Sequence, residues 1–577
     1  MFWKNASLTA TGTIELGGSN DNSTISTALT DGLVANSLVS QANSFTKEGT
    51  GTVTLATVNT YSGTTTVSAG TLVLNSSIAS SAVTVNSGAT LQISDNATLS
   101  SLTVDAGGIV IVDAGKSLTI TNDLANSGSS FTANHGASLI IGGTSTGDIT
   151  YNVTVSDENW HLLSSPVVGE GYDTSWVNAN LIDNTTDSGT NVGISTYINT
   201  TDADGDWTYV IDGASGTFAT GQGYSIKRDA TDSDISFTGT VKTDDASPTI
   251  TANDIGGGSE NRWTLIGNPY PSFINVTSLL GLTANATALE DSREALYVWN
   301  GTAYASVTTG YIHPGQGFFV NSNGASTTFA INEDMLSHRT SITFYKSTTS
   351  TVSVDLMISD GTNTKSTEIN YLADKTTGLD PRFDIGTFTG TNNSFSIYSH
   401  LVSDSNGVDF MRQALPLDFE NQIIPIGVNA EAGKEITFSA VALNLPTGIK
   451  VFLEDRTTNT FTRLDEANSE YKITLSEALN GIGRFYLHTK ASVLALNDVT
   501  LENVSIYKTN NSTLRVVGLS QGKTNVKLFN ILGKQVLNTS FKSNGVSEIS
   551  LPKLATGVYI VQLENKAGKL NKKIVLE

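Results

Sequence analysis

Short segments in which apolar and polar residues alternate run along almost the whole chain. Examples are Val83-Thr84-Val85, Val352-Ser353-Val354 and Val526-Lys527-Leu528. A period of two places one face of a β-strand in a core and the other face in solvent. Gly, Asn and Asp residues separate these segments, because they adopt the backbone conformations of tight turns. The pattern therefore predicts an all-β protein.

In the N-terminal quarter the alternating segments repeat at a nearly constant interval. Gly51, Gly70, Gly88, Gly107 and Gly128 follow one another at spacings of 19, 18, 19 and 21 residues, and apolar alternation flanks most of them. One rung of this length cannot bury its apolar residues alone, whereas stacked rungs share a continuous core. The repeat predicts a parallel β-solenoid over residues 1–148.

Two markers then occur twice in the same order. Trp160–Pro166 is echoed by Trp263–Pro269, and Gly221–Gly223 is echoed by Gly315–Gly317, at offsets of 103 and 94 residues. The repetition predicts two related β modules, in which the opening tryptophans are buried and the Gly-Gln-Gly segments form tight turns. We expect these modules at residues 149–256 and 257–336.

The rest of the chain again consists of alternating segments. From residue 337 to 495, segments such as Val352–Leu356 are separated by turn sequences such as Ser359–Thr362. This spacing is typical of a β-sandwich. A further set of alternating segments predicts a small separate sandwich at residues 496–577.

Two of these regions resemble known families. Gly51–Leu74, with Asn59–Thr65 inside it, resembles the autotransporter-associated β-strand repeat, which implies a β-helical region. The C-terminal segments Val526–Leu537, Leu554–Leu563 and Lys572–Leu576 resemble the type A C-terminal sorting domain of type IX secretion, an Ig-like β-sandwich. The residues that carry the second resemblance are Leu528, Phe529, Leu532, Gly533, Gly557, Val558, Tyr559, Lys572 and Lys573.

The sorting-domain resemblance implies a route and partners. Such proteins pass to the periplasm, are recognised by the type IX translocon of the outer membrane, and lose the domain to a cell-surface sortase. The product is secreted or remains attached to the outer-membrane surface. The chain starts without a basic segment followed by an apolar one, so the signal peptide that this route requires is missing. We therefore expect the natural chain to begin upstream.

Composition narrows the choice of partners. The net charge of the 577 residues is −22, yet residues 501–577 contain 11 Lys and Arg against 4 Asp and Glu, a local charge of +7. The rest of the chain is therefore strongly acidic, which disfavours nucleic acid as a partner. The chain has no cysteine, so we expect no disulfides. It has no apolar run of about 18 residues, so we expect no transmembrane span.

Candidate chemistry is sparse. The six histidines show no metal-ligand spacing, and no catalytic constellation is evident, so we expect no enzymatic activity. The acidic residues Asp202, Asp204 and Asp206 alternate within one short segment, and three such carboxylates can converge on Ca²⁺. The bidentate Glu of an EF-hand loop is absent, so the segment is interpreted as a hairpin turn, with calcium as the alternative and no other cofactor expected.

Three functions are compatible with these observations. The leading hypothesis is a structural or adhesin-like protein of the cell surface, whose partners include glycans or surface polysaccharide. The second is a carbohydrate-binding accessory protein in which Trp176, Trp207, Trp299 or Tyr304 stacks on sugars. The third is the C-terminal part of a larger secreted enzyme.

Overall fold

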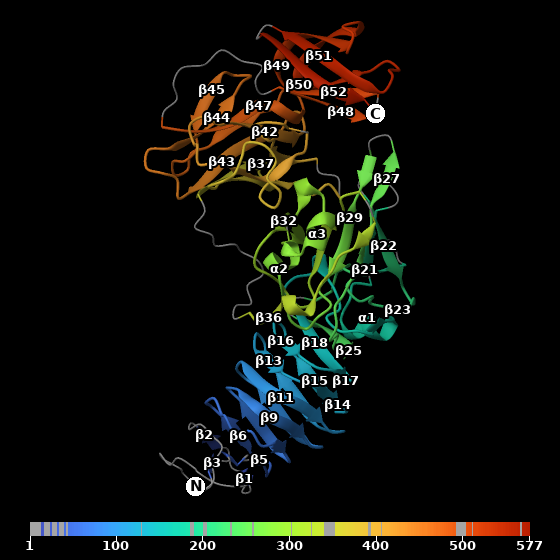
Figure 1. The fold of residues 1–577 in the computed structure, drawn as a ribbon, viewed down its shortest axis with the longest axis vertical. Helices are drawn as coiled ribbons and strands as arrows, with labels where there is room; N and C mark the ends of the chain where they lie inside the picture. The colour runs from blue at the N-terminus through green and yellow to red at the C-terminus, as the bar shows by residue number, and fades with distance from the viewer. Residues whose placement is uncertain are drawn as a thin grey trace.

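The computed structural model describes most of the chain. Outside the description lie residues 1–12, 17–22, 26–31, 34–39, 42–43, 129, 185–189, 200–204, 231–232, 257–258, 302, 325, 340–351, 391–393, 406, 492–503, 511, 566–567 and 577. The regular secondary structure of the described residues is almost entirely β-strand, and these residues form an elongated molecule (Figure 1). This confirms the predicted all-β fold. In the described residues, no helix has the length and apolar character needed to cross a membrane.

A parallel β-solenoid forms the N-terminal part, as the repeat predicted. The strands of successive turns are shared between two sheets: most turns contribute one strand to each sheet, and the last two turns contribute two short strands to the first sheet. The first sheet contains β1 (Thr13–Leu16), β5 (Ser44–Lys47), β7 (Thr65–Val67), β9 (Ile78–Val85), β11 (Ala97–Val104), β13 (Ser117–Ile120), β14 (Leu124–Asn126), β16 (Ser138–Ile141) and β17 (Ser145–Thr146). The second contains β2 (Ser23–Ile25), β6 (Thr52–Leu55), β8 (Gly70–Leu74), β10 (Ala89–Ile93), β12 (Ile109–Val112), β15 (Ser130–Ala133) and β18 (Asp148–Val155), and a small hairpin joins β3 (Gly32–Leu33) to β4 (Ser40–Gln41).

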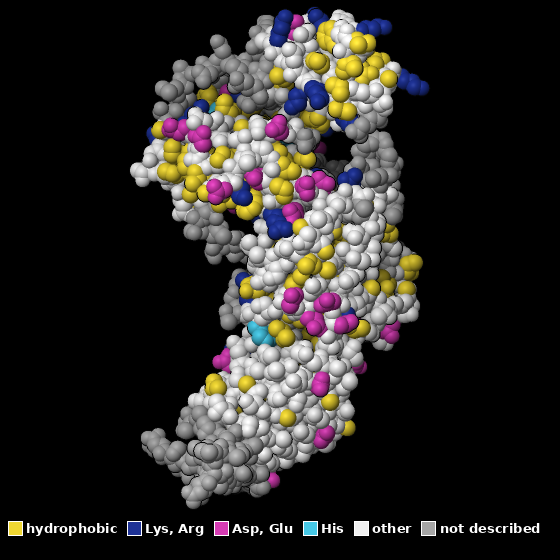
Figure 2. Space-filling view, viewed as in Figure 1, with side chains coloured by type: hydrophobic (Ala, Val, Ile, Leu, Met, Phe, Trp, Pro, Cys, Tyr) yellow, Lys and Arg dark blue, Asp and Glu magenta, His cyan; other side chains and the backbone are white. Residues whose placement is uncertain are grey.

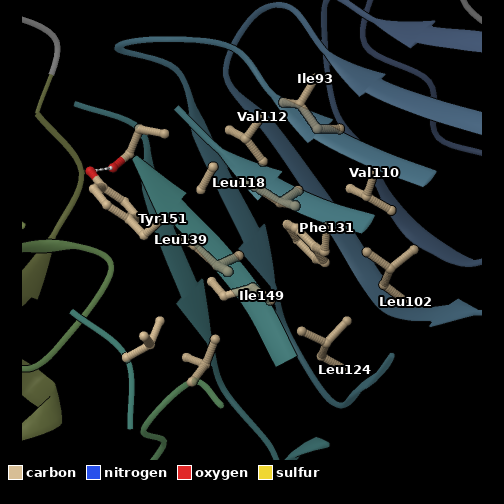
Figure 3. Close-up of a cluster of buried hydrophobic side chains, with 14 of the residues drawn as sticks. Ile93, Leu102, Val110, Val112, Leu118, Leu124, Phe131, Leu139, Ile149 and Tyr151 are labelled. Carbon is tan, nitrogen blue, oxygen red and sulfur yellow. Dashed lines mark hydrogen bonds between the residues drawn. The ribbon is translucent and has the colours of Figure 1, made fainter. Parts of the chain in front are cut away.

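The strand register reproduces the interval seen in the sequence. Leu72 lies opposite Leu91, Leu91 opposite Val110, and Val110 opposite Phe131. All four side chains are buried, so equivalent positions of successive rungs stack into one apolar column. Figure 3 shows part of the solenoid core, with Val110 and Phe131 of this column labelled. In the neighbouring column, where Tyr151 lies opposite Ala133, the hydroxyl of Tyr151 donates a hydrogen bond of 2.7 Å to the carbonyl of Ala137. The repeat in the sequence is thus the repeat of the core.

The periodic glycines differ in what surrounds them, which permits a matched test. Gly70 and Gly88 both have left-handed backbones, with φ of +64° and +77°. A Cβ atom on Gly70 would collide with the carbonyl oxygens of Gly49 and Gly51, whereas one on Gly88 would meet no atom within 4 Å. We expect Gly88→Ala to cost about 1–2 kcal/mol through the left-handed backbone alone, and Gly70→Ala to cost more. Hydrogen exchange of solenoid peptides measures the loss of stability in both variants. Equal losses of protection would contradict the prediction that the collision at Gly70 adds to the cost.

The C-terminal end of the solenoid is covered by a strand from the following region. Strand β25 (Ser233–Thr240) pairs antiparallel with all eight residues of β18. An open sheet edge exposes unpaired backbone groups and promotes aggregation. Strand β25 therefore caps the second solenoid sheet and joins it to the next module.

The repeated motifs occupy equivalent strands of two sheets with the same strand order. The first sheet runs β19 (His161–Leu163), β24 (Tyr224–Ile226), β21 (Asn191–Ile198), β22 (Asp206–Ile211), and the second runs β29 (Trp263–Gly267), β34 (Gly317–Asn321), β31 (Leu296–Trp299), β32 (Tyr304–Val307). Trp263 is buried as expected, whereas Trp160 is only half-buried and packs edge-on against Tyr209. Around these sheets lie β20 (Gly171–Tyr172), β23 (Gly216–Thr217), β26 (Thr249–Ile250), β27 (Asn253–Gly256), β28 (Ser259–Asn261), β30 (Phe273–Asn275), β33 (Tyr311–Ile312), β35 (Thr327–Thr328), β36 (Leu336–Ser337), the helices α1 (Thr174–Ala179), α2 (Val276–Gly281) and α3 (Thr283–Ala288), and the 3₁₀ turns η1 (Asp291–Arg293) and η2 (Glu333–Met335).

The Gly-Gln-Gly segments join the two sheets reciprocally. Leu163 of the first bridges Gln316 of the second, and Ile266 of the second bridges Gln222 of the first. Gly221 and Gly315 have positive φ, as a tight turn requires. The segments are therefore turns, as expected, and they also form the contact between the modules.

A large sheet follows and closes around its own core. Its order is β45 (Thr460–Arg463), β44 (Lys450–Asp455), β47 (Leu479–Lys490), β42 (Ile423–Ala430), β40 (Ser396–Ser399), β41 (Phe410–Leu415), β38 (Thr364–Tyr371), β37 (Val352–Ser359), β43 (Glu435–Leu443), β46 (Tyr471–Thr474), with β39 (Ile385–Gly386) beside β41. Val354 of β37 and Leu453 of β44 belong to one buried cluster although their strands lie far apart in the sheet. The sheet therefore folds over into a sandwich.

The C-terminal domain is a smaller sheet of the same kind. It contains β48 (Ser505–Asn510), β49 (Thr513–Asn530), β50 (Gln535–Ser550), β51 (Gly557–Asn565) and β52 (Gly568–Leu576). The first half of β49 pairs with β48 and the second half with β51. Leu514 and Leu528, from the two halves, contribute to one core. The long strands thus bend around this core.

Candidate functional site

Three of the nine sorting-motif residues, Phe529, Val558 and Lys573, come together on three neighbouring strands of the C-terminal domain. In the register of β49, β51 and β52, Phe529 lies opposite Ile560, and Ile560 lies opposite Lys573. Val558 lies opposite Val575 in the same sheet. Because alternate residues of a strand face opposite sides, these five residues share the outer face of the sheet. We call this face the outer patch.

The outer patch is apolar, exposed and flanked by positive charge. Ile560 and Val575 are 44% and 43% exposed although both side chains are large and apolar. Figure 2 shows hydrophobic side chains gathered over the C-terminal domain, with lysine and arginine around them. The motif residues Leu528 and Tyr559 instead face the core, and the Tyr559 hydroxyl donates to the carbonyl of Ala555 at 2.8 Å. Contiguous exposed apolar surface of this kind marks an interaction site.

Two further motif residues lie at the tip of the β49–β50 hairpin. Leu532 is 86% exposed, and Gly533 takes the left-handed φ of +75° that closes the turn. The side-chain oxygen of Asn530 accepts hydrogen bonds from the backbone N–H groups of Leu532 (3.0 Å) and Lys534 (2.9 Å). Ile531, which the sequence reasoning missed, is 74% exposed beside Leu532. The turn therefore holds two apolar side chains out in solvent.

The C-terminal domain packs closely on the sandwich through glycines. A Cβ atom on Gly483 of the sandwich would lie 2.9 Å from Cα of Gly545 and 3.3 Å from Cα of Gly518. Ile482 and Val517 are buried in the same contact. The absence of side chains lets the two backbones approach, so the domain is docked against the sandwich.

A second candidate site is a groove of about 820 Å³ between the second module and the sandwich. Its floor is the outer face of the sandwich sheet. In the strand register, Asp355 lies between Val441 and Glu368, and Glu368 lies beside Arg412. The Nε atom of Arg412 donates to Glu368 at 3.0 Å. One row across four strands therefore carries two carboxylates and a guanidinium.

The wall of the groove is aromatic. Tyr304 stacks on Phe388 with ring centroids 3.9 Å apart and contacts Trp299 at 5.1 Å. Trp299 and Tyr304 are half-buried and line the groove, as the second hypothesis requires of ligand-stacking residues. The groove thus combines an aromatic wall with a charged floor, and its volume is in the range of small-molecule sites.

The other two aromatic candidates pack against the protein instead. Trp176 packs against Phe218 and donates through Nε1 to the carbonyl of Ser236 at 3.1 Å. Trp207 packs edge-on against Phe319, with centroids 6.1 Å apart. Both tryptophans therefore have a packing role within the protein.

Family models match most of the residues of the chain. The model of a domain of unknown function (DUF8693) matches residues 76–309 and 300–488, which together exceed half of the chain. The chain belongs to this family. The model of the secretion system C-terminal sorting domain matches residues 499–577, and that of the passenger-associated-transport-repeat matches residues 45–74. A search of the curated proteins found no match.

The matches confirm both resemblances and the export route of this DUF8693 member. The C-terminal domain that carries the outer patch is a sorting domain, and the protein is exported by type IX secretion to the cell surface or the medium. The sorting domain therefore interacts with the secretion system. The role of the individual motif residues in that interaction stays a prediction.

The calcium candidate of this DUF8693 member falls mostly outside the described residues. Asp202 and Asp204 are not described, while Asp206 is exposed at the start of β22. One oxygen of Asp206 accepts a hydrogen bond of 2.7 Å from the backbone N–H of Trp207. Among the residues that the structure describes, no group of three or more His, Asp or Glu could hold a metal ion. Calcium binding there stays a prediction.

The histidines have structural partners, and two of them meet. His135 of the solenoid stacks on His313 of the second module with centroids 4.8 Å apart, a contact that sequence spacing could not reveal. Burial lowers the pKa of His313 to about 4, so the stacked ring is neutral at physiological pH. The remaining four form hydrogen bonds: His161 with Asp157, His338 with Thr119 and Ser138, His400 with Asp409, and His488 with Glu454.

Proposed function

We propose that this exported protein is a structural or adhesive component of the bacterial surface. The proposal rests mainly on the arrangement along the long axis, in which the solenoid and the sorting domain lie at opposite ends of the molecule (Figure 1). Attachment through the C-terminal end would point the solenoid away from the cell. The stacked rungs resist bending because each rung buries its core against the next. Such a projection suits contact with another surface.

We propose that the protein works without catalysis and without a cofactor. Two observations support this. The described histidines are engaged in packing and hydrogen bonds. The segment Gly143-Thr144-Ser145-Thr146-Gly147 has the Gly-x-Ser-x-Gly spacing of a serine-hydrolase elbow, but such an elbow is followed by a helix, whereas here β17 is followed by the solenoid strand β18. Recognition by a cell-surface sortase belongs to the same proposal, since the sorting domain is what such an enzyme removes.

Attachment of living cells tests the proposed function. We expect type IX-secreting cells that display the full chain to adhere under flow to a polysaccharide-coated surface several-fold better than cells lacking the gene. Adhesion should return when the gene is restored. Surface display is verified by antibody labelling of intact cells. Equal attachment of displaying and deficient cells would contradict the proposal.

A further inference from the structure

We propose that the groove between the second module and the sandwich binds a neutral oligosaccharide. Trp299 and Tyr304 would stack on sugar rings, and Asp355 and Glu368 would accept hydrogen bonds from sugar hydroxyls. The inference deepens the proposed adhesive function and rests on it, because it names the ligand class and the site that contacts it.

The aromatic wall supplies the first half of the recognition. A sugar ring presents C–H groups on its faces, and these pack on the face of an aromatic ring. Tyr304 is held in place by stacking on Phe388, with ring centroids 3.9 Å apart, so its side chain loses little conformational entropy when a ligand binds. Trp299 extends the wall along the hairpin that joins β31 to β32. Two neighbouring half-buried rings suit neighbouring sugar units.

The polar floor supplies the second half. Asp355 and Glu368 face each other across β37 and β38, and Ser353, Thr364 and Ser366 line the same groove. One carboxylate oxygen of Asp355 is buried and has no hydrogen-bond partner among the described residues. Buried polar atoms normally have a partner, so this oxygen is available to a ligand hydroxyl. Burial and the neighbouring Glu368 raise the pKa of Asp355.

The charges of the groove favour an uncharged ligand. Asp355 and Glu368 are balanced by Lys365 and Arg412, all four of which line the groove. A strongly acidic or basic ligand would be repelled by the groups of like charge on this floor, and removing water from the charged ligand would be unfavourable. A polyhydroxylated neutral chain instead matches a wall that stacks and a floor that accepts hydrogen bonds.

An extended peptide fits the groove less well. The edge strand β32 borders the groove and would have to pair with such a peptide through its backbone. Arg412 contacts that edge, because its guanidinium donates to the carbonyl of Ser306 at 3.1 Å and lies 3.5 Å from the hydroxyl of Thr308. The edge is therefore partly occupied by the protein itself.

Calorimetry with defined sugars tests the groove. The full chain is titrated with neutral linear hexasaccharides of glucose, xylose, mannose and N-acetylglucosamine. We expect at least one to bind, and Trp299→Ala to weaken that binding about tenfold or more. Asp355→Asn should weaken it as well, since the amide presents one acceptor fewer. Tyr209→Ala is the matched control, because Tyr209 is 39% exposed on β22, the strand equivalent to β32.

The outcomes separate this inference from the proposed function. Absence of binding to every neutral hexasaccharide, unchanged affinity in Trp299→Ala, or equal weakening in Tyr209→Ala would overturn the groove assignment. Preferential binding of a charged glycan or a peptide would overturn it too. Tyr304→Ala should weaken binding as Trp299→Ala does. Tyr304→Phe keeps the aromatic ring and should retain most of the affinity, so it tests the same wall if Tyr304→Ala does not fold. Cells that adhere while the purified chain binds no sugar would defeat the groove but not the adhesive function.

Discussion

Deletion of residues 568–577 is expected to abolish delivery of the protein to the cell surface. These residues include β52, which pairs with β51 along its whole length and buries Ile574 and Leu576 in the core. Without β52 the edge of β51 is open, and Lys573 and Val575, two of the five residues of the outer patch, are lost. The translocon would then lack its recognition surface, and the chain should remain in the periplasm. Proteinase accessibility of a tagged chain, expressed behind a signal peptide in a type IX-secreting host, measures the distribution.

A point variant distinguishes recognition from folding. Ile560→Thr combined with Val575→Thr makes the outer patch polar while keeping β-branched residues that suit a strand. We expect this chain to fold normally in vitro yet to be retained in the periplasm. Lys573→Gln tests the positive charge of the outer patch in the same way. The matched control is Val441→Thr, which alters a similarly exposed valine of the sandwich. Surface display of the patch variant at the normal level would show that the patch is not recognised.

Trp263→Ala is expected to lower the free energy of unfolding by about 3–5 kcal/mol, the range for truncating a buried tryptophan. Trp263 is 1% exposed and packs against Tyr297 (4.7 Å) and Phe388 (4.5 Å). Its Nε1 donates to the hydroxyl of Thr389 at 3.0 Å. Tyr297 belongs to the second module, and Phe388 and Thr389 belong to the sandwich. The substitution should therefore loosen the contact between them as well as the module itself.

Urea unfolding followed by circular dichroism measures this loss. Trp263→Phe should cost less, because it keeps an aromatic ring against Tyr297 and loses the hydrogen bond to Thr389. Trp299→Ala should cost least, because that residue is half-buried at the groove. A loss below about 1 kcal/mol in Trp263→Ala would mean that the cavity collapses or that the contact is not tight.

Local pattern predicted the solenoid well for a definite reason. Parallel rungs stack with equivalent positions opposite one another, so the interval between glycines equals the register between strands. Leu72, Leu91, Val110 and Phe131 could be aligned from the printed sequence, and the structure stacks them. The sorting motifs were recognised for a similar reason, since each lies within one strand or turn near the chain end.

Other predictions from local pattern were incomplete. The Gly-Gln-Gly segments read as turns, but their role in joining the modules depends on partners about a hundred residues away. Trp160 and Trp263 open equivalent segments, yet only Trp263 is buried, because only it is covered by residues of the sandwich. Sequence similarity between two segments does not report what lies against each of them.

Only some residues of the groove could be predicted from the local sequence. Trp299 and Tyr304 were candidates from the sequence, whereas Asp355, Glu368 and Arg412 were not, since nothing in their local sequence marks them. They meet because β37, β38 and β41 are neighbours in a sheet whose strand order is not the chain order. By itself the sequence determined the all-β class, the repeat of the solenoid and the sorting signal, because each is written in contiguous residues. Only the tertiary structure decided which faces stay exposed and which distant side chains share a site, because long-range strand pairing sets both.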